Sequence, residues 1–153
     1  MVTIFIKQNG DFFVEMLPHR TTFTGDYFRE VIIPQIYQLA FPNKITRSTK
    51  KALLHFDNVP SHKEHRAMET LNDCPFHLLL NPPYSPDIAP LDFGVFGTIK
   101  EMMPPESSES EEELKETIIE ILHQLGKGFI NKVFLAWKER LRKVIESKGL
   151  YIK

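Results

Sequence analysis

The sequence predicts an α/β protein with a mixed β-sheet, and three observations support this class. Four short apolar runs, at residues 2–7, 12–17, 52–56 and 76–80, have the length and residue types of strands. Longer segments between and after them carry apolar residues at helical spacing. The order begins with a strand hairpin and then alternates strands with helices, which favours a mixed sheet flanked by helices.

The first two runs form a predicted hairpin. Residues 2–7 alternate in polarity, and the Asn9-Gly10 pair suits the positive φ angles of a tight turn. Thr24 can then cap a helix that begins near Asp26. Pro34 lies inside this helical pattern, so we expect it to kink the helix or to end its first part.

The third run, residues 52–56, is almost continuously apolar, which predicts a strand buried on both faces. Ser61 and Glu64 form a capping box for a helix that extends to about Asn72. The fourth strand, residues 76–80, follows that helix. This part of the chain therefore predicts a strand, a helix and a second strand.

A proline-rich loop follows the fourth strand and sets the direction of the chain. Each proline fixes φ and lacks an N–H group, so the loop predicts a stiff connector. Asp92 comes just after this loop, near the expected start of a helix, where an ionised carboxylate is favoured. Asp57 directly follows the third strand. A carboxylate at a strand end and another on a rigidly placed helix could share one metal site. The prolines are Pro82, Pro83, Pro86 and Pro90.

The C-terminal third predicts two helices. Ser110 and Glu113 form a capping box for the first, Gly126 and Gly128 break it, and Gly149 ends the second. Trp137 lies on an apolar stripe, which is more typical of a core residue than of a base-stacking platform.

The composition limits the function classes. The net charge is −1 over 153 residues, so no overall basic bias toward nucleic acid exists. Residues 127–153, however, hold eight Lys or Arg and two Glu. The single cysteine, Cys74, excludes an internal disulfide and fits a reducing compartment. No apolar run approaches membrane-spanning length, so we expect an intracellular protein.

Three segments resemble mariner-type DDE transposases of the Tc1/mariner superfamily. They are H-F-D-N-V-P-S-H at residues 55–62, P-P-Y-S-P-D-I-A-P-L-D-F at residues 82–93, and R-L-R-K-V-I-E-S-K-G-L-Y-I at residues 140–152. In that family thirty-four residues separate the second and third catalytic acids, and the same number separates Asp57 from Asp92.

The resemblance implies an RNase H-like fold and a metal-dependent DNA cleavage chemistry. Residues 1–103 would be a partial catalytic core, and residues 104–153 the C-terminal helical part of the same domain. Asp57 and Asp92 would be catalytic residues and would bind Mg²⁺ or Mn²⁺. Asn58 and His62 would support them, and a eukaryotic protein of this kind would be nuclear. DNA would be the partner, weakly contacted by a basic group: Lys132, Lys138, Arg140, Arg142 and Lys143.

The sequence departs from the family pattern at its start. The family uses three acids, and the first lies on a central strand that would precede residues 2–7. We therefore expect a transposase fragment that lacks this strand and cannot cleave DNA alone. Two alternatives remain: a protein-interaction module that associates with full-length transposase or a host protein, and an enzyme whose remaining segment is encoded upstream of Met1.

Loss of a central strand would expose two sheet edges, and exposed edges recruit strands or aggregate. The gap could close by pairing of residues 2–7 with residues 52–56, a second chain could supply a strand, or the hairpin could detach. We expect closure within a single chain, together with marginal stability or self-association in solution.

Overall fold

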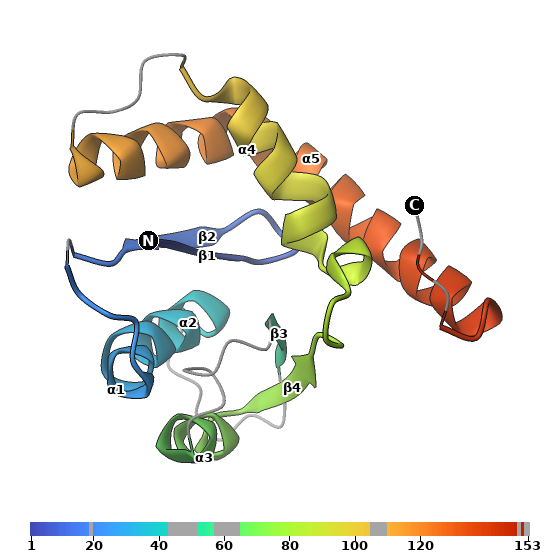
Figure 1. Cartoon of the computed structure of the whole chain (residues 1–153), viewed down its shortest axis with the longest axis horizontal. Helices are drawn as coiled ribbons and strands as arrows, with labels where there is room; N and C mark the ends of the chain where they lie inside the picture. The colour runs from blue at the N-terminus through green and yellow to red at the C-terminus, as the bar shows by residue number, and fades with distance from the viewer. Residues whose placement is uncertain (19, 43–51, 57–64, 105–109, 150, 152–153) are drawn as a thin grey trace.

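The computed structural model describes the chain except for residues 19, 43–51, 57–64, 105–109, 150 and 152–153 (Figure 1). Its strands are β1 (Val2–Ile6), β2 (Phe12–Met16), β3 (Ala52–Phe56) and β4 (Phe76–Leu80). Its helices are α1 (Gly25–Tyr27), α2 (Ile33–Ala40), α3 (His65–Asp73), α4 (Gly97–Met102) and α5 (Glu111–Glu146). Three further helical segments are not α-helices. η1 (Phe28–Ile32) and η4 (Leu91–Phe96) are π-helices, and η3 (Pro86–Ile88) is a 3-10 helix.

The predicted hairpin is confirmed. β1 and β2 pair antiparallel, with Ile4 opposite Val14. Gly10 has a φ of 91°, and its N–H donates to the Lys7 carbonyl over 2.9 Å. The turn therefore uses the left-handed conformation that glycine adopts without strain.

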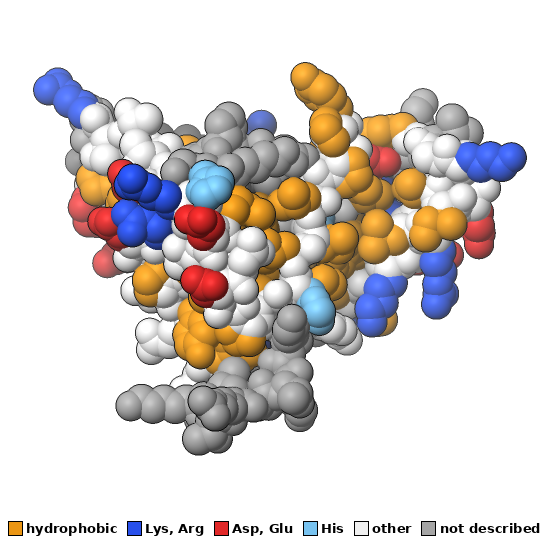
Figure 2. Space-filling view, turned by 90° about the horizontal axis from the view of Figure 1, so that it is seen from below, with side chains coloured by type: hydrophobic (Ala, Val, Ile, Leu, Met, Phe, Trp, Pro, Cys, Tyr) orange, Lys and Arg blue, Asp and Glu red, His pale blue; other side chains and the backbone are white. Residues whose placement is uncertain are grey.

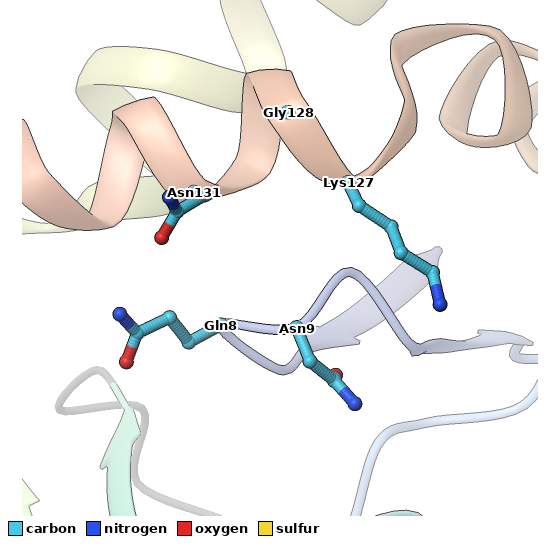
Figure 3. A pocket seen from close by; sticks show the side chains of 5 residues that line it. All are labelled: Gln8, Asn9, Lys127, Gly128 and Asn131. Carbon is cyan, nitrogen blue, oxygen red and sulfur yellow. The ribbon is translucent and has the colours of Figure 1, made fainter.

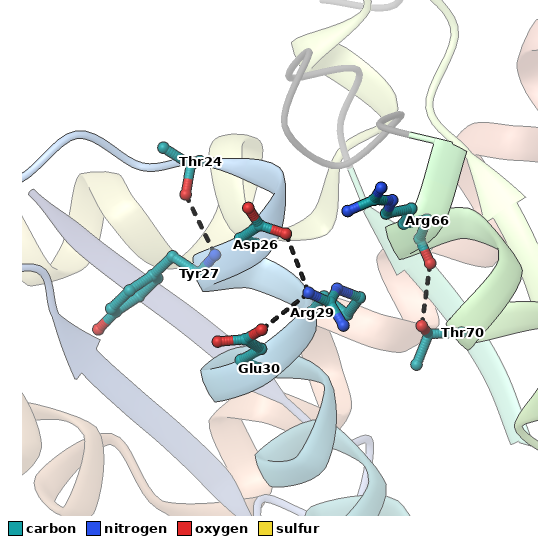
Figure 4. A network of polar contacts seen from close by, with 7 residues as sticks. All are labelled: Thr24, Asp26, Tyr27, Arg29, Glu30, Arg66 and Thr70. Carbon is teal, nitrogen blue, oxygen red and sulfur yellow. Dashed lines mark hydrogen bonds and ion pairs between the residues drawn. The ribbon is translucent and has the colours of Figure 1, made fainter.

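The helix after the hairpin begins where its capping residue predicts. The Thr24 hydroxyl accepts a hydrogen bond of 3.1 Å from the Tyr27 N–H (Figure 4). Pro34 does not end this helix. Because proline cannot donate to the preceding turn, the chain widens into the π-helical segment η1, where the Ile33 N–H donates to the Phe28 carbonyl. Helix α2 then continues with Pro34 in its first turn.

The hairpin lies between two helical layers, each with its own hydrophobic core. Ile4 and Val14 pack on one face of the hairpin with Ile118 and Ile130 of α5. The opposite face meets a second core that contains Phe28. Residues of both sheets share this second core: Phe5, Phe13, Leu54 and Phe56. The hairpin and the β3–β4 pair are thus parts of one strand layer.

This layer is interrupted, and the expected closure is wrong. Among the described residues, the strands form two separate two-stranded sheets, β1–β2 antiparallel and β3–β4 parallel. No backbone hydrogen bond joins β1 to β3 in this part of the chain. The hairpin packs on α5 on one face and on the second core on the other, whereas β3 and β4 pack on the second core.

The expected burial of β3 on both faces is also wrong. Leu54 and Phe56 are buried in the second core, but the side chain of Leu53 on the opposite face is 60% exposed. Only the end of that face near His55 is covered, by Trp137 of α5. Trp137 is itself buried, as its position on an apolar stripe predicts.

The C-terminal helices begin and break where predicted. The Ser110 hydroxyl accepts a hydrogen bond of 3.1 Å from the Glu113 N–H. Gly126 has φ 68° and ψ 172° and separates the two halves of α5. Gly149, with φ 91°, follows the last turn and donates its N–H to the Val144 carbonyl. No helix in the described ranges is long and apolar enough to cross a membrane.

Candidate functional site

The site is built where β3 and β4 end side by side. Phe56 is the last residue of β3 and directly precedes Asp57. Asn81 follows β4 and begins the proline loop that leads to Asp92. The Asn81 N–H donates to the Phe56 carbonyl over 3.0 Å. The two segments that carry the predicted acids therefore start from adjacent points.

A buried amide fixes the start of the proline loop. Asn81 is only 7% exposed. Its side-chain nitrogen donates to the Ser85 carbonyl over 3.0 Å, and its side-chain oxygen lies 3.3 Å from Nε2 of His55. Because a buried amide without partners is costly, these bonds hold the loop close to the end of β3. Figure 1 shows the loop passing from β4 toward the segment that precedes α4.

Asp92 lies in the first turn of η4 and is exposed. Its backbone N–H donates to the Ala89 carbonyl over 3.0 Å. The same short helix packs tightly on α5 at Gly94, where an added Cβ atom would lie 2.7 Å from Cγ1 of Val133. Glycine at this point lets η4 approach α5, which sets the position of Asp92.

Arg140 of α5 holds the proline loop from the other side. Its guanidinium donates to the Asp87 carbonyl over 3.1 Å and lies 4.4 Å from the centroid of the Phe93 ring. Asp87 is buried, so its carbonyl is otherwise shielded from water. One side chain thus connects the loop, η4 and α5.

The predicted site residues fall into three groups. Asp57, Asn58 and His62 lie outside the described residues. Asp92 occupies the rigid helix start that the prolines predict. The members of the basic group lie on the second half of α5; they are exposed except for Arg140, which is half-buried. Figure 2 shows blue side chains at the right-hand end of the molecule, over this half of α5.

Sequence analysis did not predict that His55, Asn81 and Arg140 position the proline loop at this site. A polar residue inside an apolar strand, followed by a polar residue just after the next strand, is a weak signal for the His55–Asn81 contact. The Arg140 contacts give no local signal, because residues 53 positions apart meet only in the folded chain.

An exposed carboxylate suits Mg²⁺ or Mn²⁺, which prefer oxygen ligands. Asp92 can provide one such ligand. In the portion of the chain that the structure describes, no group of three or more His, Cys, Asp or Glu side chains could hold a metal ion. The donor chemistry of Asp92 fits such an ion, and the other ligands would come from outside the described set.

An open hollow lies elsewhere, between the hairpin turn and the second half of α5 (Figure 3). It is lined by Gln8, Asn9, Lys127, Gly128 and Asn131. None of these residues belongs to the elements that carry the predicted acids. The hollow and the Asp92 site are therefore formed by different residues.

No protein-family model matches the chain. Two curated relatives do match over 99% of it: the Mariner Mos1 transposase of Drosophila mauritiana, 27% identical, and the Histone-lysine N-methyltransferase SETMAR of Homo sapiens, 24% identical. The chain is homologous to mariner transposase. It spans 44% of the Mos1 protein and 22% of SETMAR, so most of each relative lies outside the match.

Solved structures show the same mariner fold. The Mos1 transposase catalytic domain, determined with Raltegravir and Mg, matches with a TM-score of 0.86 and 23% identity, covering 99% of this chain and 76% of that one. A Mos1 paired-end complex with the left transposon end matches with a TM-score of 0.84 and 22% identity, covering 99% of this chain and 44% of that one. The predicted RNase H-like class is confirmed by this likeness.

Proposed function

We propose that this chain contributes Asp57 and Asp92 to a metal-dependent centre that cleaves phosphodiester bonds of DNA. The hydrogen bond between Asn81 and Phe56 carries the proposal, because it brings together the two segments that bear these acids. The homology to a transposase and the likeness to a catalytic domain determined with Mg support the same chemistry.

The chain's own residues would supply ligands and position. Asp92 would offer an oxygen ligand from the start of η4, and Asp57 would offer another from the end of β3. These carboxylates would hold divalent ions, and such ions would supply charge stabilisation for the reacting oxygens of the phosphodiester. Gly94 and Arg140 are positioning residues, because they set η4 and the loop against α5.

We propose further that these 153 residues bind the ions weakly and do not cut DNA by themselves. Two carboxylates are few ligands for an ion that gives up water reluctantly. Mn²⁺ added to isotope-labelled protein should broaden the amide signals around Asp57 and Asp92. Replacement Asp92→Asn should remove the broadening, whereas Asp73→Asn, at the exposed end of α3, should not change it. Broadening that survives Asp92→Asn would refute the shared site.

Activity is tested separately from metal binding. We expect no nicking of supercoiled plasmid by the purified chain in Mg²⁺ or Mn²⁺. Nicking that disappears in an Asp57→Ala variant would contradict the proposed inactivity and would point to a third ligand within the chain. DNA as the partner is supported by the Mos1 complexes with transposon ends.

An interaction module is the second candidate function. The interruption between the two sheets favours it, because unpaired strand edges are binding sites for other strands. Full-length transposase or a host protein would be the partner. Nuclear localisation and the division at residue 103 remain predictions.

A further inference from the structure

Tyr84 lies in the proline loop with its ring in solvent. The residue is 99% exposed, more than any other large hydrophobic residue in the part of the chain that the structure describes. A single exposed apolar side chain is normal on a protein surface, so the exposure alone carries no conclusion. The conformation of its backbone and the hydrogen bonds of the loop distinguish Tyr84 from the other exposed hydrophobic residues.

The backbone of Tyr84 has an unfavourable conformation for a bulky side chain. Its φ is 55°, in the left-handed region that residues with a Cβ atom rarely adopt. Glycine or asparagine takes this conformation more easily. Because a tyrosine occupies the position instead, the turn does not explain the side chain. Strained residues of this kind cluster at functional sites, so the ring points to a function.

Two hydrogen bonds close the loop around Tyr84. The Asn81 side-chain nitrogen donates to the Ser85 carbonyl over 3.0 Å, and the Ser85 hydroxyl donates to the Pro83 carbonyl over 3.1 Å. Pro82 and Pro83, which directly precede the tyrosine, have fixed φ angles. The ring therefore projects from a stiff base. A residue on such a base loses little conformational freedom when it binds a ligand.

The same loop is joined to the basic half of α5. The Arg140 guanidinium donates to the carbonyl of Asp87, three residues after Tyr84. Lys143 follows Arg140 by three positions, so it lies on the same side of the helix, and it is exposed. A cation and a fixed aromatic ring are thus carried by elements in contact. Proteins bind unpaired nucleic-acid strands with this combination, in which cations contact phosphates and aromatic rings stack on bases.

We propose that Tyr84 binds an unpaired nucleobase of DNA by stacking. Phosphates of the same strand would contact the basic half of α5, with Lys143 among the contacts. Stacking needs a free face of the base, so the ligand is a single-stranded or locally unpaired segment and not an intact duplex. Every base has such a face, so the contact would select no sequence.

This inference rests on the proposed function, in which DNA is the partner, and it adds a ligand for a residue that the metal chemistry does not use. The loop that carries Tyr84 leads to Asp92 at the start of η4. A stacked base would therefore hold the strand at the loop that bears the proposed metal ligand. The cationic half of α5 beside the loop favours a nucleic acid over a protein as the ligand of the ring.

The test uses the whole 153-residue chain and two labelled single strands of equal length. One is an oligothymidylate, and the other has the same phosphates but abasic sugars throughout. Fluorescence anisotropy in EDTA measures both affinities without metal ions. We expect the chain to bind the oligothymidylate about tenfold more tightly than the abasic strand. Tyr84→Ala should remove this preference and leave the affinity for a blunt duplex unchanged, and Tyr84→Phe should keep the preference, because its ring also stacks.

Two further variants separate the stacking role from a structural one. Tyr151 is another exposed tyrosine, at 62%, in the basic C-terminal segment, and Tyr151→Ala should keep the preference for the oligothymidylate. Tyr84→Asn removes the ring but tolerates the left-handed backbone. It should lose the preference while its urea midpoint stays the same or rises. A lower midpoint together with equal losses of affinity for both strands would mean that the ring supports the fold, and the proposal would be wrong.

The same titrations distinguish this inference from the proposed function. Equal affinity of the unsubstituted chain for the oligothymidylate and the abasic strand would mean that the ring stacks on no base. A protein surface would then be the remaining class of ligand, and the inference would fail while DNA binding stands. Absence of binding to both strands and to the duplex would refute DNA as the partner. Loss of metal binding at Asp92 would change none of these results, because the assay contains no free metal ions.

Discussion

Arg140 is predicted to contact DNA as a member of the basic group, yet its guanidinium contacts other parts of the chain. It donates to the Asp87 carbonyl and lies over the Phe93 ring. The neighbouring Arg142 is exposed and forms only a long ion pair of 3.7 Å with Glu139 in the described part. Arg140 and Arg142 carry the same charge on the same helix but differ in role, because Arg140 contacts the proline loop and Arg142 is exposed.

The pair Arg140→Ala and Arg142→Ala separates these roles. Loss of the Arg140 contacts should lower the free energy of unfolding by about 1–3 kcal/mol, from one cation–π contact and one hydrogen bond. Loss of the exposed Arg142 pair should change it by less than about 1 kcal/mol. Urea unfolding followed by tryptophan fluorescence measures both, because Trp137 lies in the same region. Equal effects of the two substitutions would contradict the structural role of Arg140.

Tyr27 gives a test that depends on pH. Its hydroxyl donates to Glu15 over 2.9 Å, and Glu15 also pairs with Lys115 at 3.4 Å. Burial, and next the bond to Glu15, raise the pKa of the Tyr27 phenol. Because the pKa of Tyr27 is higher in the folded chain, the neutral phenol contributes to the free energy of unfolding. This contribution is fully present below the pKa of tyrosine in the unfolded chain, about 10, and is lost as the pH rises through the pKa in the folded chain.

Absorbance at tyrosine wavelengths should therefore show the phenol of Tyr27 titrating above the ordinary tyrosine pKa of about 10. In Glu15→Gln the pKa of Tyr27 should fall toward its usual value but stay above it, because burial remains. The Tyr27→Phe variant should lose the latest step. If the latest step persists in that variant, another tyrosine is responsible.

At the scale of elements, the position of η4 depends on its approach to α5. Gly94 allows this approach, since an added Cβ would lie 2.7 Å from Val133. Gly97, one turn later, has no neighbouring atom within 4 Å of the same position. The two glycines are therefore a matched pair on one stretch of helix.

Gly94→Ala should lower the free energy of unfolding by about 1–3 kcal/mol, because overpacking forces the helices apart. It should also weaken Mn²⁺ binding, since Asp92 moves with η4. Gly97→Ala should be neutral or stabilising by about 0.5–1 kcal/mol, because alanine favours the helix. Denaturant unfolding and the Mn²⁺ titration check both effects. A stable Gly94→Ala protein with unchanged Mn²⁺ binding would show that the close packing does not position Asp92.

At the scale of the whole molecule, the distribution of charge matters more than its sum. The net charge is −1, but residues 127–153 hold eight Lys or Arg against two Glu. The second half of α5, which carries most of them, lies at one end of the molecule in Figure 2. We therefore expect weak DNA binding through this half, without sequence preference, because phosphate contacts carry none.

Lys138→Ala should lower DNA affinity and reduce the slope of log affinity against log salt by about one. Lys100→Ala, at an exposed site on α4, removes the same charge elsewhere and should leave that slope unchanged. Fluorescence anisotropy with a labelled duplex at several salt concentrations gives the slope. Equal slopes for the two variants would place the DNA contact outside the second half of α5.

Local sequence patterns predict the elements and the resemblance to mariner transposases. Local signals are enough for this: Asn9-Gly10 specifies a turn, Thr24 and Ser110 cap helices, and Gly126 breaks one. The proline loop and the spacing of Asp57 and Asp92 indicate the mariner resemblance, because both are visible directly in the amino-acid sequence. Whether these two acids meet is still a prediction, since Asp57 lies outside the described residues.

The placement of the strands depends on long-range packing, which no local pattern predicts. Local patterns allow residues 2–7 to pair with residues 52–56, but in the described part of the chain the two strands belong to separate sheets. The exposed face of Leu53 has the same origin, because a continuous apolar run does not say how many faces will be covered. The contacts of Arg140 and of His55 with Asn81 join distant residues, and such contacts depend on packing that no local pattern encodes.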